Sequence, residues 1–297
     1  MYYNAVNRES RTTETGFLIM SNIKTIFRSR YHLIYMIVAL ALVIGAIILL
    51  AMLTERSAKI RTDYTGLSEE KGYPMSTLDI DNMFYDEYDF RSYADENYVS
   101  RRGIDVSEHQ GYIDWERVKE CGVEFAIIRL GFSSYDDGSL HMDTWYEDNI
   151  KGARDAGIDI GVYFFSQATT VDEAVEEARF VLEHVPSKLE MPIAFDMEPV
   201  TDHDRIADLG MREKTEIADA FCAVVEQNGY KSLIYGNPTW IYSSCNLSLL
   251  TGRELWLAHY TFWSGFPYEY AIWQYSSEGT LDGISTSVDL NMQLVRK

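Results

Sequence analysis

Two carboxylates separated by a single residue end an apolar run in the second half of the chain. The run reads Met191-Pro-Ile-Ala-Phe-Asp-Met-Glu-Pro199. If it forms a strand, Asp196 and Glu198 lie on one face, roughly 7 Å apart. A charged face is costly unless it opens on a cleft. Paired carboxylates with pKa values driven apart perform glycoside hydrolysis, which is our first hypothesis; two solvated loop acids are the alternative.

Two more acids belong to other strand-like segments. The first such segment, residues 103–107, contains Asp105, and the last, residues 286–290, contains Asp289. In a barrel the carboxyl ends of the strands meet at one mouth, and closure makes the first and last strands neighbours. We therefore predict one catalytic site composed of four acids, Asp105, Asp196, Glu198 and Asp289.

Aromatic side chains accompany these acids, in the strands or directly after them. A flat ring with a polar tip suits the apolar face of a sugar. Strands favour aromatic residues in any case, so some of these belong to the core. The predicted substrate-binding residues are Tyr163, Tyr235, Trp256, Tyr260, Trp273 and Tyr275.

The pattern from residue 101 to residue 297 predicts one α/β domain with a (β/α)-barrel-like fold. Apolar runs bounded by turn residues predict eight strands, and amphipathic segments separate several of them. About ten residues separate the runs at 254–259 and 270–275, too few for a crossover helix, so the last strands are expected to pair antiparallel. A doubly wound open sheet is the alternative. The predicted strands cover 103–107, 125–131, 160–166, 192–198, 232–236, 254–259, 270–275 and 286–290.

The first hundred residues have a different character. Residues 33–53 carry no charge and are long enough to cross a bilayer core of about 30 Å, which predicts a transmembrane helix rather than a cleavable signal peptide. Residues 1–32 would then be a cytoplasmic segment. Residues 54–100 are acidic and rich in tyrosine, without a regular period, and we interpret them as a juxtamembrane linker. The alternative is a stalk whose aromatic side chains pack on the neighbouring domain.

Charge and composition narrow the possible partners. The formal net charge of −20 leaves no basic stripe for phosphates, so nucleic acid is not an expected partner. The three cysteines, Cys121, Cys222 and Cys245, lack metal-binding spacing and are expected to be free thiols, with a Cys222–Cys245 bridge as the alternative. The cluster Asp202-His-Asp204 is interpreted as a solvated helix start. We expect neither a metal nor another cofactor.

Several ordered motifs between residues 102 and 295 resemble glycoside hydrolase family 25, the muramidases. The motifs are Gly103-Ile-Asp-Val-Ser-x-x-Gln-Gly111, Ile113-Asp-Trp115, Phe195-Asp-Met-Glu198, Leu255-Trp-Leu-Ala258 with Tyr260, Trp273-Gln-Tyr-Ser276 and Val288-Asp-Leu-Asn291. The resemblance implies a flattened β/α barrel that cleaves the β-1,4 bond between N-acetylmuramic acid and N-acetylglucosamine in peptidoglycan. It also implies that Glu198 is the catalytic acid, with Asp196 as its partner. Phe165 departs from the His or Tyr more often expected there, which bears on substrate contacts.

The resulting hypothesis is a membrane-anchored peptidoglycan hydrolase. Glu198 would protonate the glycosidic oxygen, and the Asp-x-Glu spacing favours substrate assistance by a 2-acetamido group held by Asp196. A carboxylate nucleophile and inversion through water stay open. A catalytically inactive, wall-binding barrel is the main alternative, while an amidase or peptidase lacks its zinc motif. Because peptidoglycan lies outside the membrane, we expect a single-pass cell-membrane protein with an extracellular barrel, bound to the bilayer through residues 33–53.

Overall fold

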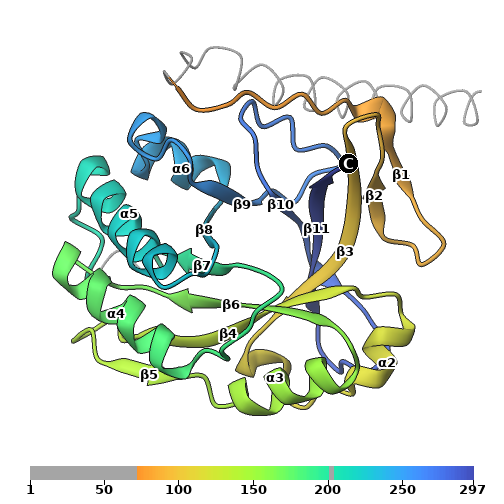
Figure 1. The fold of residues 1–297 in the computed structure, drawn as a ribbon, viewed down its shortest axis with the longest axis horizontal. Helices are drawn as coiled ribbons and strands as arrows, with labels where there is room; N and C mark the ends of the chain where they lie inside the picture. The colour runs from red at the N-terminus through yellow and green to blue at the C-terminus, as the bar shows by residue number, and fades with distance from the viewer. Residues whose placement is uncertain (1–71, 201–203) are drawn as a thin grey trace, which may run out of the picture. The chain divides into compact units, whose positions relative to one another are not determined.

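The computed structural model describes residues 72–200 and 204–297, coloured along the chain in Figure 1. Within these residues a nine-stranded sheet has the order β3-β11-β10-β9-β8-β7-β6-β4-β5. An additional pairing of β3 with β4 closes eight of its strands into a barrel. The strands of this sheet are β3 (Tyr98–Val106), β4 (Phe125–Ser133), β5 (Leu140–Met142), β6 (Asp159–Phe165), β7 (Ile193–Asp196), β8 (Ser232–Gly236), β9 (Glu254–Ala258), β10 (Ile272–Gly279) and β11 (Val288–Arg296).

Helices follow most of the early strands and lie on the outside of the barrel (Figure 1). Their starts have local causes, because the side chains of Asp114, Thr170 and Asn237 each accept a backbone N–H of the first turn. The longest helix ends before Gly229, whose φ of 86° favours glycine. The helices are α2 (Trp115–Glu120), α3 (Tyr146–Asp155), α4 (Val171–His184), α5 (Met211–Gln227) and α6 (Pro238–Ser244), with 3-10 turns η1 (Ile80–Asn82), η2 (Glu108–Gln110) and η3 (Leu247–Leu249).

The last strand of the barrel runs antiparallel to both of its neighbours, as expected for the end of the chain. The short connection between residues 259 and 270 was expected to join antiparallel strands, and here the prediction is wrong, because β9 and β10 pair in parallel. Strand β11 pairs antiparallel with both β10 and β3, whereas β3, β4, β6, β7, β8, β9 and β10 follow one another in parallel. The connection from β9 to β10 contains no helix. These seven parallel strands therefore direct their carboxyl ends to the same mouth of the barrel.

Side-chain alternation separates two cores. The barrel interior is filled by residues such as Phe125, Ile127, Leu233, Trp256 and Ile272. The other face of the same strands packs against the helices and forms the larger core. Because both faces are buried, these strands read as continuous apolar runs in the sequence.

The segment 72–100 differs from the expected linker. It contains a separate two-stranded sheet, β1 (Met83–Tyr85) with β2 (Arg91–Tyr93), followed by the first residues of β3. Phe90 and Tyr93 are buried in the larger core. The alternative of a packed stalk therefore describes this segment, because its aromatic side chains bury enough apolar surface to order an acidic chain.

The predicted transmembrane segment at 33–53 lies outside the described residues, as do residues 1–32 and the linker up to residue 71. Across 72–200 and 204–297, none of the helices has both the length and the apolar character that a bilayer crossing requires. The three cysteines are free in the structure.

Candidate active site

Four carboxyl groups predicted to form the site are placed at the mouth formed by the carboxyl ends of the strands. Asp196 is the last residue of β7, and Glu198 follows two residues later, beyond the strand. Asp105 of β3 lies directly opposite Asp289 of β11. The charges of Glu198 and Asp105 both act on Asp196, so the groups form one electrostatic cluster.

Asp105 is fixed by two buried amides. Its Oδ2 accepts hydrogen bonds from Gln274 Nε2 and Asn291 Nδ2, each at 2.7 Å. The amide oxygens are also engaged: Gln274 Oε1 accepts from Tyr235 at 2.9 Å, and Asn291 Oδ1 accepts from Trp256 Nε1 at 2.8 Å. The whole network is buried, which holds the Asp105 carboxyl group in one orientation.

Burial changes the protonation of the pair across β3 and β11. The pKa of Asp105 lies well above its ordinary value because of burial, and then because of the charge of Asp289. Burial also raises the pKa of Asp289, to about 6, although its hydrogen bond with Asp105 opposes the shift. Two neighbouring carboxyl groups share a proton more readily than both ionise. The hydrogen bond between the two groups raises the pKa of Asp105 and lowers that of Asp289, so a shared proton favours Asp105.

Burial likewise raises the pKa values of the second pair. Glu198 titrates at about 7 rather than 4.5, first because of burial and then because of the charge of Asp289. The pKa of Asp196 lies well above its ordinary value because of burial and the charges of Glu198 and Asp105, while Arg129 lowers it. Among the described residues, the buried Oδ1 of Asp196 has no hydrogen-bond partner. A buried acceptor without a partner is unusual in a folded protein and requires an explanation.

Arg129, in the middle of β4, places a positive charge beside the acids. Its Nε donates to Asp143 Oδ2 at 2.7 Å, and its Nη2 donates to Glu108 Oε1 at 2.8 Å. These two ion pairs hold the guanidinium group in place, and its charge acts on both Tyr163 and Asp196. Arg129 thus offsets part of the negative charge of the mouth.

Four of the six predicted aromatic residues belong to this mouth or to the barrel interior beneath it. Trp256 packs edge-on against Tyr163 and Tyr235, with ring centroids 6.1 and 4.7 Å apart. Because Trp256 is buried and bonded to Asn291, it supports the site from below. Tyr260 is 54% exposed and donates to Gln274 Oε1 at 2.8 Å, so its ring can meet a ligand at the mouth.

Trp273 and Tyr275 do not belong to the site, and here the structure corrects the prediction. Both side chains point out of the barrel into the larger core, while the alternate residues Ile272 and Gln274 point inward. The guanidinium carbon of Arg91 lies 5.8 Å from the Trp273 ring centroid and 5.2 Å from that of Tyr275. These two rings therefore pack against Arg91 of the segment 72–100 and are not available to bind a sugar.

The sequence analysis missed Gln274, Asn291 and Arg129 as parts of the site. The period of two places Asn291 on the same face as Asp289, so its inward direction followed from the sequence. Gln274 lies between Trp273 and Tyr275, whose predicted inward direction placed the amide on the opposite face. Arg129 lay within an apolar strand, where a single charge requires a nearby partner. The isolated charge in an apolar strand was therefore the sequence signal that could have identified Arg129.

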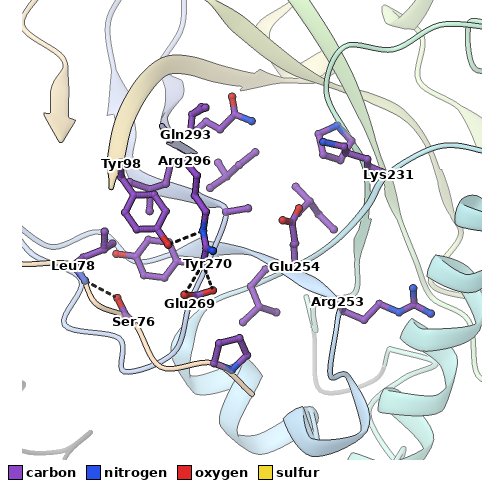
Figure 2. A pocket seen from close by; sticks show the side chains of 18 of the residues that line it. Ser76, Leu78, Tyr98, Lys231, Arg253, Glu254, Glu269, Tyr270, Gln293 and Arg296 are labelled. Atoms are coloured by element: carbon purple, nitrogen blue, oxygen red, sulfur yellow. Dashed lines mark hydrogen bonds and ion pairs between the residues drawn. The ribbon is translucent and has the colours of Figure 1, made fainter. Parts of the chain in front are cut away.

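A separate cavity of about 450 Å³ lies at the opposite end of the barrel. Its wall includes Tyr73 and Leu78 of the N-terminal segment, and Figure 2 shows Arg296 bonded to both Tyr98 and Glu269 there. None of the four predicted catalytic acids lines it.

Of the cluster Asp202-His-Asp204, the first two residues lie outside the described part of the chain.

Comparisons with known proteins identify a family and several relatives of this chain. Residues 104–284 match the family model described as "Glycosyl hydrolases family 25". Lysozyme M1 of Streptomyces globisporus is 28% identical over 202 residues, which cover 64% of this chain and 66% of that protein. The autolytic lysozyme of Clostridium acetobutylicum is 29% identical over 191 residues, which cover 64% of this chain and 55% of that protein. The chain thus spans less than two thirds of either relative.

A solved structure supports the fold. The modular autolysin LytC of Streptococcus pneumoniae, in complex with a synthetic peptidoglycan ligand, superposes with a TM-score of 0.60 at 24% identity. The match covers 75% of this chain and 52% of that chain. At this identity the likeness concerns the barrel and its connections.

Proposed function

The chain belongs to glycosyl hydrolase family 25, and from that premise we propose that it is a muramidase that cleaves the β-1,4 bond between N-acetylmuramic acid and N-acetylglucosamine in peptidoglycan. The observation that carries the proposal is the pairing at the end of β7. There Glu198 holds a proton up to a pH of about 7, beside an Asp196 oxygen without a partner among the described residues. An acid and a free acceptor side by side are the groups that glycosidic cleavage with substrate assistance requires.

In the proposed reaction Glu198 protonates the glycosidic oxygen as the bond to the sugar carbon breaks. Asp196 Oδ1 accepts the N–H of the 2-acetamido group, which orients the acetamido oxygen for attack on that carbon. The negative charge of Asp196 stabilises the positive charge that develops on the acetamido group. Water, deprotonated by the ionised Glu198, then opens the cyclic intermediate and restores the proton of Glu198.

The other groups of the mouth have supporting roles in this proposal. Asp105 and Asp289 share a proton and carry negative charge toward the sugar carbon, while the amides of Gln274 and Asn291 fix Asp105. Tyr260 and the half-buried Tyr163 are the aromatic rings proposed to contact the sugar, because both retain exposed surface. The reaction as proposed uses side chains of this chain, the substrate and water.

The reaction product tests the proposal. Purified protein is incubated with peptidoglycan, the fragments are reduced with borohydride, and mass spectrometry identifies the reduced sugar. A muramidase yields reduced N-acetylmuramic acid, whereas a glucosaminidase yields reduced N-acetylglucosamine. An inactive wall-binding barrel would pellet with the peptidoglycan without releasing fragments, and this outcome would refute the hydrolase.

We also propose that residues 33–53 anchor the protein in the cell membrane, with the barrel outside. The support is the uncharged apolar sequence of this stretch and the extracellular location of peptidoglycan. Protease added to intact cells is expected to remove the barrel while an epitope placed before residue 33 stays protected. Protection of the barrel with loss of that epitope would reverse the orientation, and recovery of the full chain in the soluble fraction would exclude the anchor.

A further inference from the structure

Glu198 lies beyond the end of β7, where the barrel ladder no longer holds the backbone. The preceding residue on the same face, Asp196, is still tied, because its carbonyl accepts the N–H of Ser166 at 2.7 Å. At Glu198 the backbone carbonyl instead accepts a side-chain hydrogen bond, from Gln167 Nε2 at 3.3 Å. The position of the proposed acid therefore depends on a contact from the loop that follows β6.

Gln167 is itself held by buried groups. It is 0% exposed, and its backbone N–H donates to Ser133 Oγ at 2.6 Å. The hydroxyl of Ser133 in turn donates to Oε1 of Glu177, a residue of α4 that is 2% exposed. A continuous chain of hydrogen bonds thus runs from α4 through the end of β4 to the backbone of Glu198.

A second connection joins the same two loops. Arg205, which follows Glu198 in the loop between β7 and α5, donates from Nη1 to the carbonyl of Gln167 at 3.0 Å. Its Nη2 lies 2.7 Å from Glu173 Oε1, and Glu173 also accepts from the backbone and the hydroxyl of Thr169. The loop that contains Glu198 is therefore held to the loop after β6 by two hydrogen bonds of Gln167. Its side chain donates to the Glu198 carbonyl, and its own carbonyl accepts from Arg205.

These polar groups have no need to be buried for the fold alone. Glu177 is unusual on the inner face of a helix, and burial raises its pKa to about 7 although Ser166, Ser133 and the Gln167 amide donate to it. The Oε1 of Gln167 has no hydrogen-bond partner among the described residues. Burying polar groups without full hydrogen bonding lowers the stability of the fold, so their presence requires an explanation other than stability.

We propose that Gln167 is a positioning residue that holds the backbone of Glu198 in its catalytic place, and that Glu177 supports Gln167 through Ser133. This inference rests on the proposed function for its catalytic consequence, but its structural content concerns the order of residues 197–200. Gln167 lies behind the acid and acts through the Glu198 carbonyl, not on the substrate.

The test compares Gln167→Leu with a matched control, Tyr146→Phe. Both substitutions remove one part-buried side-chain hydrogen bond to a backbone carbonyl, since Tyr146 donates to the carbonyl of His184 at 3.2 Å. For Gln167→Leu we expect kcat to fall about 10- to 100-fold with KM within twofold, because a small displacement of an acid has this effect. The falling limb of its pH–rate profile is expected at lower pH, because a loosened Glu198 is better solvated. Tyr146→Phe is expected to lower only the thermal midpoint.

Two further measurements separate the outcomes. Hydrogen exchange of the peptide covering residues 193–200 is expected to accelerate in Gln167→Leu and not in Tyr146→Phe, whether or not the protein proves to be a muramidase. Unchanged exchange there, or an unchanged kcat and pH limb, would overturn the positioning role. Absence of hydrolysis by the wild type would overturn the proposed function, while accelerated exchange would still support the positioning role.

The series of hydrogen bonds can also be tested at Glu177, its end on α4, where a conservative variant should preserve activity. Glu177→Gln keeps an oxygen that accepts from Ser133, so we expect kcat within twofold of the wild type. Glu177→Leu removes that acceptor and is expected to resemble Gln167→Leu in kcat, pH limb and exchange. Equal behaviour of the two Glu177 variants would contradict the role given to this residue.

Discussion

Replacing Glu198 with glutamine is expected to lower kcat for peptidoglycan hydrolysis by about 10²- to 10⁴-fold, the usual contribution of general acid catalysis. Glutamine matches glutamate in size but has no acidic proton to give to the glycosidic oxygen. The fold should be unaffected, because Glu198 lies beyond β7 at a partly exposed position. Release of reducing sugars and a thermal melt measure the two effects, with Glu176→Gln, an exposed position on α4, as the control. Retention of more than a tenth of the activity would refute the acid assignment.

The pH dependence of the wild type follows from the same group. Burial raises the pKa of Glu198 from 4.5 to about 7, so the proton is present below that value and is lost above it. The rate is therefore expected to fall as the pH rises through about 7. If Glu198 had an ordinary pKa, the rate would already fall between pH 4 and 5, and a profile of that kind would contradict the burial of this acid.

Replacing Asp196 with asparagine is expected to lower kcat by about 10²-fold, a typical loss when one electrostatic group at a reaction centre is removed. Asparagine keeps the shape and an amide oxygen but loses the negative charge that faces the acetamido group. The thermal midpoint at pH 7 should not fall, because burial and the charges of Glu198 and Asp105 make an ionised Asp196 unfavourable in the folded state. Steady-state hydrolysis and differential scanning calorimetry provide the two numbers.

A change of substrate isolates the role of Asp196. If this residue holds the 2-acetamido group, the wild type should lose activity on glycan whose N-acetylmuramic acid has been de-N-acetylated. Asp196→Asn should then show a much smaller ratio between the two substrates. Equal wild-type rates on both glycans would exclude substrate assistance and favour a carboxylate nucleophile or direct attack by water.

The sequence predicted the barrel well where a single physical signal dominated. The strand at 232–236 has the predicted bounds. The four acids proposed as catalytic were expected at strand ends, and the structure brings them to one mouth, although Asp289 lies at the amino end of β11. Local period and topology therefore sufficed for these parts.

The sequence could not show which residues of β10 face the interior of the barrel. Ile272, Trp273 and Tyr275 are all apolar or aromatic, so the pattern does not say which set faces the interior of a strand buried on both sides. Only the register beside Asp105 reveals that Gln274 points inward. The segment 72–100 was misjudged because its strands have three residues each, too short to show a period.

The folded segment before β3 also determines at which end of the barrel the preceding part of the chain is joined. Tyr73 donates to the carbonyl of Arg253, at the amino end of β9, whereas the acids lie at the mouth formed by the carboxyl ends of the parallel strands. Whatever precedes residue 72 is therefore attached roughly 15 Å or more from the mouth, by the length of a five-residue strand. If residues 33–53 anchor the protein as proposed, the tether would join the barrel at the end away from the proposed catalytic acids. The distance at which those acids could reach peptidoglycan would then depend on the length of chain between residue 53 and Tyr73.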